Sequence, residues 1–239
     1  MTEDVVRFEV PLYTVAEAAR ALAVPVSTFH TWARGYERLR PDGRRHGYGP
    51  VVSSTSTARL GPTIPFVGLA EGMVLAAIRR ANVPLQRVLP ALDVLRDEIG
   101  IAHALASRRL FTDGAELLFD YADTLADAGD AQAVRELVVV RSGQRVFSEI
   151  VEGYLRRIEY DADDGYARLI RLPGYERAHV IADPTRSFGQ PIFAHGGARV
   201  SDVLDRFQAG EDVRSLADEF GVPPLEIEDA LRAASRRAA

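Results

Sequence analysis

Residues 12–34 form the stretch LYTVAEAARALAVPVSTFHTWAR, which decides the fold of the N-terminal part of the chain. Thr14 is a good N-cap residue, and Glu17 three positions later completes a capping box. Apolar residues then recur at helical spacing, which predicts a first helix with one apolar face. Because Pro25 disfavours the helical region for Val24, this helix is expected to end before the proline.

A second helix is expected to begin near Val26 or Ser27, with Phe29 and Trp32 facing inward. Its outward side chains are small or able to form hydrogen bonds: Ser27, Thr28, His30, Thr31 and Arg34. Two short helices joined by a tight turn, the second with a polar outer face, are typical of a helix-turn-helix. The sequence therefore predicts DNA contact through these five residues.

Basic residues are concentrated directly after this helix pair. From Ser27 to Arg59 the chain has six arginines against two acidic residues, a net charge of +4. The segment RLRPDGRRHGYGPVVSSTS, residues 38–56, is rich in Gly, Pro and Ser, which predicts a loop or a wing hairpin around Asp42-Gly43. Arginine makes bidentate contacts with phosphate and guanine, so the expected DNA-binding set also includes Arg38, Arg40, Arg44 and Arg45.

The composition of the 239-residue chain excludes several functions. There is no cysteine, which excludes disulfides, Cys-ligated zinc and thiol nucleophiles. All 29 basic residues are arginine, which excludes Schiff-base chemistry. No apolar run is long enough to span a membrane and the N-terminus lacks the features of a signal peptide, so we expect a cytoplasmic protein without a membrane partner.

Residues 58–175 are expected to form a mixed α and β middle domain. Two helices are predicted, one over 66–81 and a second from Val83 to Glu98 with a kink at Pro90. Antiparallel hairpins are expected over 110–121, 136–150 and 155–170, with turns at 113–114, 142–143 and 163–165. Before the helix-turn-helix, residues 5–10 alternate enough to predict an edge strand.

Residues 176–239 are expected to form a C-terminal three-helix domain, after loops and a short strand. Ser201 and Asp212 are expected to cap the first two helices, and Pro223-Pro224 to open the third. The last two helices resemble a second helix-turn-helix. However, from Val200 to Leu231 nine acidic residues stand against two arginines, a net charge of −7. The second helix of this pair is expected to expose the carboxylates of Glu226, Glu228 and Asp229. These carboxylates would repel the phosphates of DNA.

This acidic unit is therefore interpreted as a module for dimerisation or for a protein partner, and a plain three-helix lid without a partner stays open. The expected fold class is α+β and mainly helical. An N-terminal winged helix-turn-helix (residues 1–57) precedes the middle domain and the three-helix domain.

Patterns typical of enzymes are missing from the sequence. The five histidines are scattered without the spacing of a metal site, and there is no nucleophile elbow or dinucleotide-binding glycine motif. The residues from Asp161 to Gly165 are expected to form a polar hairpin turn rather than a calcium loop, and His195-Gly196-Gly197 a turn before a helix. We therefore expect no catalytic residue, no metal and no cofactor.

The N-terminal motif resembles the start of MerR-type DNA-binding domains. The matching residues are Tyr13-Thr14, Glu17-Ala18-Ala19, Val24, Ser27-Thr28-Phe29 and Trp32. The C-terminal segment, from Ile181-Ala-Asp-Pro to Leu-Ala-x-Glu-Phe-Gly-Val, is similar to a three-helix family often encoded beside PIN-domain toxins. Gly-Ala-Arg-Val-Ser (197–201) departs from that family, which has Thr and Pro there. Together the two ends resemble a long type of VapB antitoxin.

The resemblance implies an antitoxin that blocks a PIN-domain ribonuclease and represses its own operon. Because a single winged module buries too little surface for tight specific binding, a homodimer on two half-sites is expected. A PIN site holds carboxylates around Mg²⁺, so an inserted arginine would be a suitable blocker. The candidate partner-contacting residues are Arg199, Arg214, Glu226, Glu228, Arg232, Arg236 and Arg237. Two alternatives stay open: a MerR-like transcriptional regulator that responds to a small ligand or protein through the middle domain, and an adaptor without DNA contact.

Overall fold

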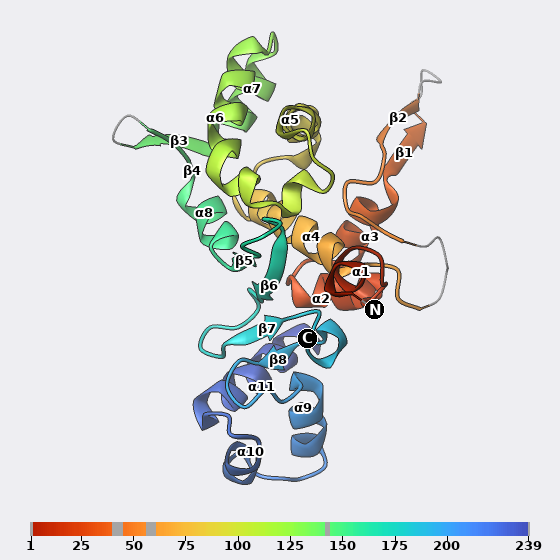
Figure 1. Ribbon diagram of the computed structural model, residues 1–239, viewed down its shortest axis with the longest axis vertical. Helices are drawn as coiled ribbons and strands as arrows, with labels where there is room; N and C mark the ends of the chain where they lie inside the picture. The colour runs from red at the N-terminus through yellow and green to blue at the C-terminus, as the bar shows by residue number, and fades with distance from the viewer. Residues whose placement is uncertain (1, 40–44, 56–60, 142–143, 239) are drawn as a thin grey trace.

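The computed structural model describes residues 2–39, 45–55, 61–141 and 144–238 (Figure 1). Over these residues the chain is mainly helical with short antiparallel strands, which confirms the predicted α+β class. No helix in the described part of the chain is long and apolar enough to cross a membrane.

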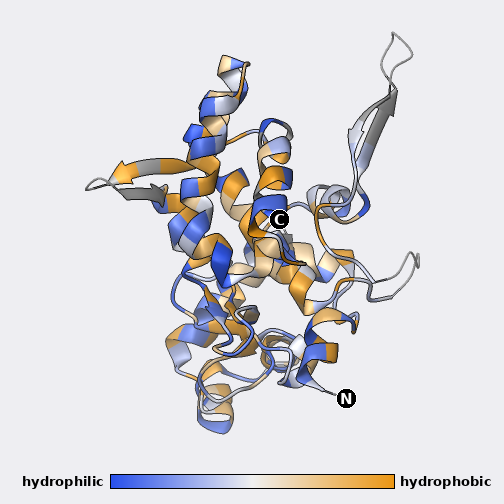
Figure 2. Cartoon of the chain, turned by 45° about the horizontal axis from the view of Figure 1, so that its top comes forward, coloured by the Kyte–Doolittle hydropathy of each residue, from blue (hydrophilic) through white to orange (hydrophobic). Residues whose placement is uncertain are grey.

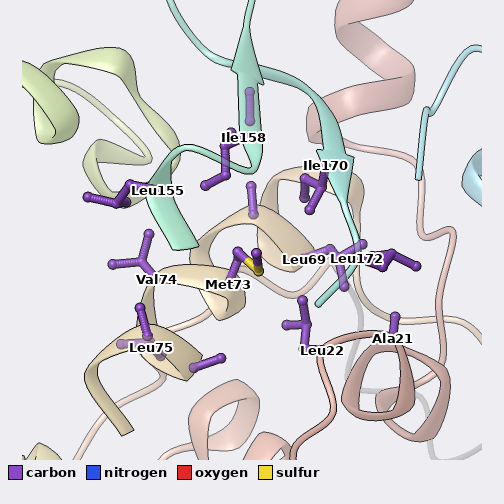
Figure 3. Packing of buried hydrophobic residues seen from close by; sticks show 14 of the residues in the cluster. Ala21, Leu22, Leu69, Met73, Val74, Leu75, Leu155, Ile158, Ile170 and Leu172 are labelled. Carbon is purple, nitrogen blue, oxygen red and sulfur yellow. The ribbon is translucent and has the colours of Figure 1, made fainter. Parts of the chain in front are cut away.

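Helix α4 (Phe66–Arg80) lies at the centre of the fold. Every residue from Phe66 to Ile78 is buried, as expected for a core helix that is apolar on most faces. Figure 3 shows α4 between Leu22 of the N-terminal helices and Ile158 and Ile170 of the sheet. Two hairpins project from the body in both views (Figures 1 and 2): β1 (Tyr36–Leu39) with β2 (Arg45–Tyr48), and β3 (Val138–Arg141) with β4 (Gln144–Phe147).

The N-terminal part begins with a helix rather than the predicted edge strand at 5–10. It contains α1 (Glu3–Phe8), α2 (Val15–Ala21), α3 (Val26–Arg34), β1 (Tyr36–Leu39) and β2 (Arg45–Tyr48). Helix α1 buries Arg7, whose guanidinium pairs with Asp4 on the same helix at 2.6 Å and with Asp164 of a distant turn. The Asp4–Arg7 pair favours the helix over the strand, because residues at i,i+3 lie on one face of a helix but on opposite faces of a strand.

The middle of the chain contains more helix than the sequence predicts. Its elements are α5 (Leu85–Ile99), η1 (Ala104–Ala106), α6 (Arg108–Thr124), α7 (Ala128–Arg135), β3 (Val138–Arg141), β4 (Gln144–Phe147) and α8 (Glu149–Leu155). Helix α5 begins at Leu85, two residues after the predicted start, and continues through Pro90, where the predicted kink stays a prediction.

The predicted hairpin over 110–121 is wrong, because these residues belong to α6. Leu110, Gly114 and Leu118 are buried at i,i+4 spacing, so the apolar stripe outweighs the turn preference of Asp113-Gly114. The hairpin over 136–150 is confirmed as the pair β3–β4. Its turn residues 142–143 lie outside the described residues, and Ile150 belongs to α8 rather than to the strand.

A four-stranded antiparallel sheet follows. Its strands pair in sequence order: β5 (Ile158–Tyr160), β6 (Ala167–Arg171), β7 (Val180–Ala182) and β8 (Ile192–Phe193). The hairpin β5–β6 is confirmed, and its turn is polar because the Asp161 side chain accepts hydrogen bonds from the N–H groups of Asp163 and Asp164. Since β6 pairs with β7, the sheet continues across residue 175, and the three-domain division stays a prediction.

Three helices close the chain after the short η2 (Ser187–Gly189): α9 (Val200–Gln208), α10 (Val213–Phe220) and α11 (Pro224–Ala238). The predicted cap by Asp212 is confirmed, since its side chain accepts from the N–H groups of Arg214 and Ser215. The predicted cap by Ser201 is wrong. Helix α9 already begins at Val200, and the Ser201 hydroxyl contacts Asp202 instead.

Candidate nucleic-acid interface

The first helix of the helix-turn-helix begins at the predicted capping box. The N–H of Glu17 donates to Thr14 Oγ1 at 3.2 Å, and the Glu17 carboxylate accepts from the N–H of Thr14 at 2.7 Å. The turn after α2 contains Ala23 in a left-handed conformation (φ 54°), and Pro25 occupies the N-cap position of α3. The local sequence thus fixes both helix starts.

Helix α3 is held by its inner face. Phe29 and Trp32 are buried as predicted, and their ring centroids lie 5.9 Å apart. The N–H groups of Val51 and Val52 donate to the carbonyl of Trp32 at 2.8 and 3.1 Å, which ties α3 to the chain that enters α4. A Cβ atom at Gly72 of α4 would lie 2.6 Å from Phe29 Cε2, so the close packing of α3 on α4 depends on glycine at position 72.

The outer face of α3 presents the predicted polar residues to different degrees. Ser27 and His30 are exposed, whereas Thr28, Thr31 and Arg34 are half-buried. The Thr31 hydroxyl donates to the carbonyl of Ser27 at 2.9 Å, so its proton is used within the helix. Ser27 and His30 are therefore the best placed of the five for contact with base edges.

The predicted wing is present as the antiparallel pair β1–β2. Gly35 adopts φ 79°, and a Cβ atom there would lie 2.6 Å from the carbonyl oxygen of Tyr48, so only glycine allows this entry into the wing. The register places Arg38 opposite His46 and Leu39 opposite Arg45. The predicted contacts Arg40 and Arg44 lie outside the described residues.

Two arginines beside α3 are absent from the predicted set. Arg79 and Arg80 are exposed at the last turn of α4 and line an open groove of about 880 Å³ together with Thr28 and Thr31. Arg80 Nε donates to the hydroxyl of Tyr154 at 3.1 Å. The sequence shows only two arginines at the end of a core helix, and tertiary packing brings them next to the recognition helix.

The C-terminal acidic residues differ from the prediction. Glu226 and Asp229 are buried, at 6% and 2% exposure, instead of lying on an exposed face. Asp229 accepts from the N–H groups of residues 176, 177 and 178 at 2.8, 2.9 and 3.0 Å, and Glu226 from that of His179 at 3.2 Å. Burial alone would raise the pKa of Asp229, but the three N–H donors outweigh it and hold the pKa below its usual range.

The remaining partner candidates lie at the surface of the three-helix unit. Arg232 pairs with Glu228 at 3.6 Å, Arg236 with Glu176 at 3.4 Å, and Arg199 with Asp202 at 3.3 Å. Arg214 is exposed on α10. Arg237 lies on α11, but its side chain is outside the described part.

A serine, a histidine and a glutamate also meet beside α4. Ser53 Oγ and Glu71 Oε1 lie 3.0 and 3.2 Å from the same ring atom, Nδ1 of His103. A catalytic triad needs the nucleophile and the acid on opposite ring nitrogens, so this group does not form one. The carboxylate of Glu71 also accepts from the N–H of Ser53 at 2.6 Å, which indicates a structural role.

Comparison with known proteins agrees with this arrangement. Residues 11–92 match a family described as "putative DNA-binding HTH domain", and residues 180–234 match a protein family of unknown function, DUF433. A protein of Mycobacterium tuberculosis named "putative antitoxin VapB45" is 50% identical over 233 residues, which cover 95% of each chain. This chain belongs to the VapB45 family of antitoxins.

A solved structure supports the same fold. The crystal structure of Rv2018 from Mycobacterium tuberculosis matches with a TM-score of 0.81 at 47% identity, over 94% of this chain and 99% of that chain. Membership of the VapB45 family and the matched domain together show an antitoxin with a DNA-binding helix-turn-helix. The matched domain extends to residue 92, so it includes α4 with Arg79 and Arg80.

Proposed function

We propose that this antitoxin represses its own operon by binding operator DNA as a homodimer and neutralises a cognate PIN-domain ribonuclease. The observation that carries the DNA half is the polar face of α3, fixed on α4 by buried Phe29 and flanked by Arg79 and Arg80. Such a rigid helix can place side chains in the major groove, where base pairs differ in their donors and acceptors.

The contacts divide into two kinds. Ser27 and His30 are exposed on α3 and are assigned to base edges. Arg79 and Arg80 are assigned to two phosphates per subunit, and the wing, where the side chains of Arg38 and Arg45 lie outside the described residues, is assigned to a third. One winged module buries too little surface for tight specific binding, so two copies would read two half-sites about 34–36 Å apart.

The toxin half rests on family membership and on charge. A PIN site gathers carboxylates around Mg²⁺, and an arginine from the antitoxin would occupy it. Arg214 is the best candidate because it is exposed on α10, and among the described residues no ion pair holds its guanidinium. The other surface arginines, Arg199, Arg232 and Arg236, already pair with a carboxylate of this chain.

Operator binding is tested by fluorescence anisotropy on DNA from upstream of the gene, at several salt concentrations. With about six phosphate contacts per dimer, affinity is expected to fall as roughly the fifth power of salt concentration. Replacing both Arg79 and Arg80 by Ala should lower this slope by about 3–4, since two contacts per subunit are lost. Arg168→Ala, an exposed arginine on β6 that pairs with Glu159, is the matched control and should leave the slope unchanged.

A slope near 1 for the unmodified protein would contradict this mode of DNA binding. The toxin half is tested separately by purification from the intact operon, where a stoichiometric small ribonuclease is expected. Arg214→Ala should then weaken its retention, and Arg232→Ala should have the smaller effect. If the chain is purified without a ribonuclease, the proposal of toxin neutralisation is overturned. The proposal of operator binding is then decided by the anisotropy measurement alone.

A further inference from the structure

Two histidines and a glutamate that are far apart in the sequence meet where α11 packs on the β7–β8 hairpin. His179 precedes β7, His195 follows β8, and Glu226 lies in the first turn of α11. One potential ligand atom from each residue lies within 4.8 Å of the other two. Sequence spacing did not predict this group, because its members belong to three separate elements.

The carboxylate is the fixed member of the group. The Glu226 side chain is 8% exposed, and its Oε1 lies 2.7 Å from Nδ1 of His195. Its Oε2 accepts from the backbone N–H of His179 at 3.2 Å. The two imidazole rings are exposed, with centroids 5.7 Å apart and planes inclined by 32°. A buried carboxylate thus faces the rings of two exposed histidines.

The backbone around these residues is held by specific contacts. The N–H of Ala194 donates to the carbonyl of His179 at 2.7 Å, which links the two histidine-bearing segments. Gly196 adopts φ 72°, and a Cβ atom there would lie 1.9 Å from the carbonyl oxygen of Phe220. Because only glycine fits, the turn that carries His195 is pressed directly against the end of α10.

We propose that His179, His195 and Glu226 bind a divalent transition-metal ion of the Zn²⁺ type. Imidazole nitrogen and carboxylate oxygen are ordinary zinc ligands, and two nitrogens favour this class over Mg²⁺ or Ca²⁺. Three protein ligands leave a fourth position for water or for a side chain of a partner. The ion would join α11 to the β7–β8 hairpin; His195 and Glu226 lie inside the region that matches DUF433, and His179 directly precedes it.

Binding requires a small rearrangement. Ligand atoms around tetrahedral zinc lie about 3.3 Å apart, so His195 Nδ1 must move about 0.6 Å away from Glu226, and any pair at the 4.8 Å limit must close by about 1.5 Å. The exposed rings of His195 and His179 can rotate to allow this. The competing interpretation is that these residues bind no metal and only stabilise the fold by hydrogen bonds between α11 and the β7–β8 hairpin.

The test is calorimetric titration of tag-free, chelator-treated full-length protein with ZnCl₂, together with thermal unfolding. We expect one Zn²⁺ per chain and a Tm raised by about 5–10 °C when the free ion exceeds Kd by about a hundredfold. His179→Ala and His195→Ala should each weaken binding at least about tenfold. His30→Ala, an exposed histidine on α3, is the matched control and should bind as the unmodified protein does.

Two results would overturn the proposal: binding no tighter than about 1 mM by the unmodified protein, or undiminished binding by the double variant H179A/H195A. Both histidines are exposed, so these variants are expected to fold. Glu226→Gln adds a second test, in which zinc binding is lost while the far-ultraviolet circular dichroism keeps its helical form.

Discussion

Replacing Gly72 by Ala tests whether the recognition helix depends on a glycine in α4. A Cβ atom at position 72 would lie 2.6 Å from Phe29 Cε2 and 2.9 Å from Leu22 Cδ1. Ordinary contact begins at 3.4 Å, so the Phe29 ring must move about 0.8 Å. Phe29 and Leu22 are 0% and 1% exposed, so the ring would have to move within a closely packed core.

The magnitude follows from two opposed effects. Overpacking a filled core typically costs about 1–3 kcal/mol, whereas Gly to Ala inside a helix stabilises by about 0.5–1 kcal/mol. The net expectation is a loss of about 1–2 kcal/mol in the free energy of unfolding, or about 2–8 °C in Tm. Because Phe29 belongs to α3, operator affinity should fall together with stability.

Gly153→Ala is the matched control for this substitution. Gly153 also lies inside a helix, α8, but a Cβ atom there meets no atom within 4 Å. The same chemical change should therefore stabilise the protein by about 0.5–1 kcal/mol and leave operator affinity unchanged. Urea unfolding of the two variants measures both free energies. A Gly72→Ala protein as stable as the Gly153→Ala protein would refute the packing argument.

Two further substitutions test the contacts of the C-terminal unit. Since the folded-state pKa of Asp229 is lowered, its contribution to stability is full above the unfolded value of about 3.9 and is lost as pH falls through the folded pKa. Asp229→Asn should lower the free energy of unfolding near pH 7 by about 1–3 kcal/mol and reduce its decline below pH 4 in an acid-unfolding series. Tyr13→Phe removes a buried hydrogen bond of 2.7 Å from the hydroxyl to the carbonyl of Gly189 and should cost about 1–2 kcal/mol in urea unfolding. An unchanged midpoint would mean that water replaces this link.

The helix-turn-helix could be predicted from the sequence because its determinants are local. Thr14 and Glu17 satisfy each other within one turn, and Pro25 acts on the residue beside it. The inward positions of Phe29 and Trp32 follow from helical spacing alone. Each of these effects operates over a few residues, so no tertiary information was needed.

The errors at α1 and α6 have the opposite cause. In α1 the buried Arg7 pairs with Asp164, which is 157 residues away along the chain. In α6 the buried stripe of Leu110 and Leu118 outweighs a local turn motif. Arg79, Arg80 and the group around Glu226 likewise become neighbours of their sites only through packing, which spacing within one segment cannot reveal.

The C-terminal helix pair, α10 and α11, does not resemble a DNA-binding helix-turn-helix in its contacts, although the reason differs from the one that the sequence suggested. Repulsion by exposed Glu226 and Asp229 does not apply, because both carboxylates are buried and bonded to backbone N–H groups of residues 176–179. Through these hydrogen bonds, residues 176–179, which lead into β7, pack against the first turns of α11. A recognition helix contacts bases through its N-terminal residues, and here these residues already face protein. We therefore infer that α10 and the outer side of α11, rather than the start of α11, are available to a partner.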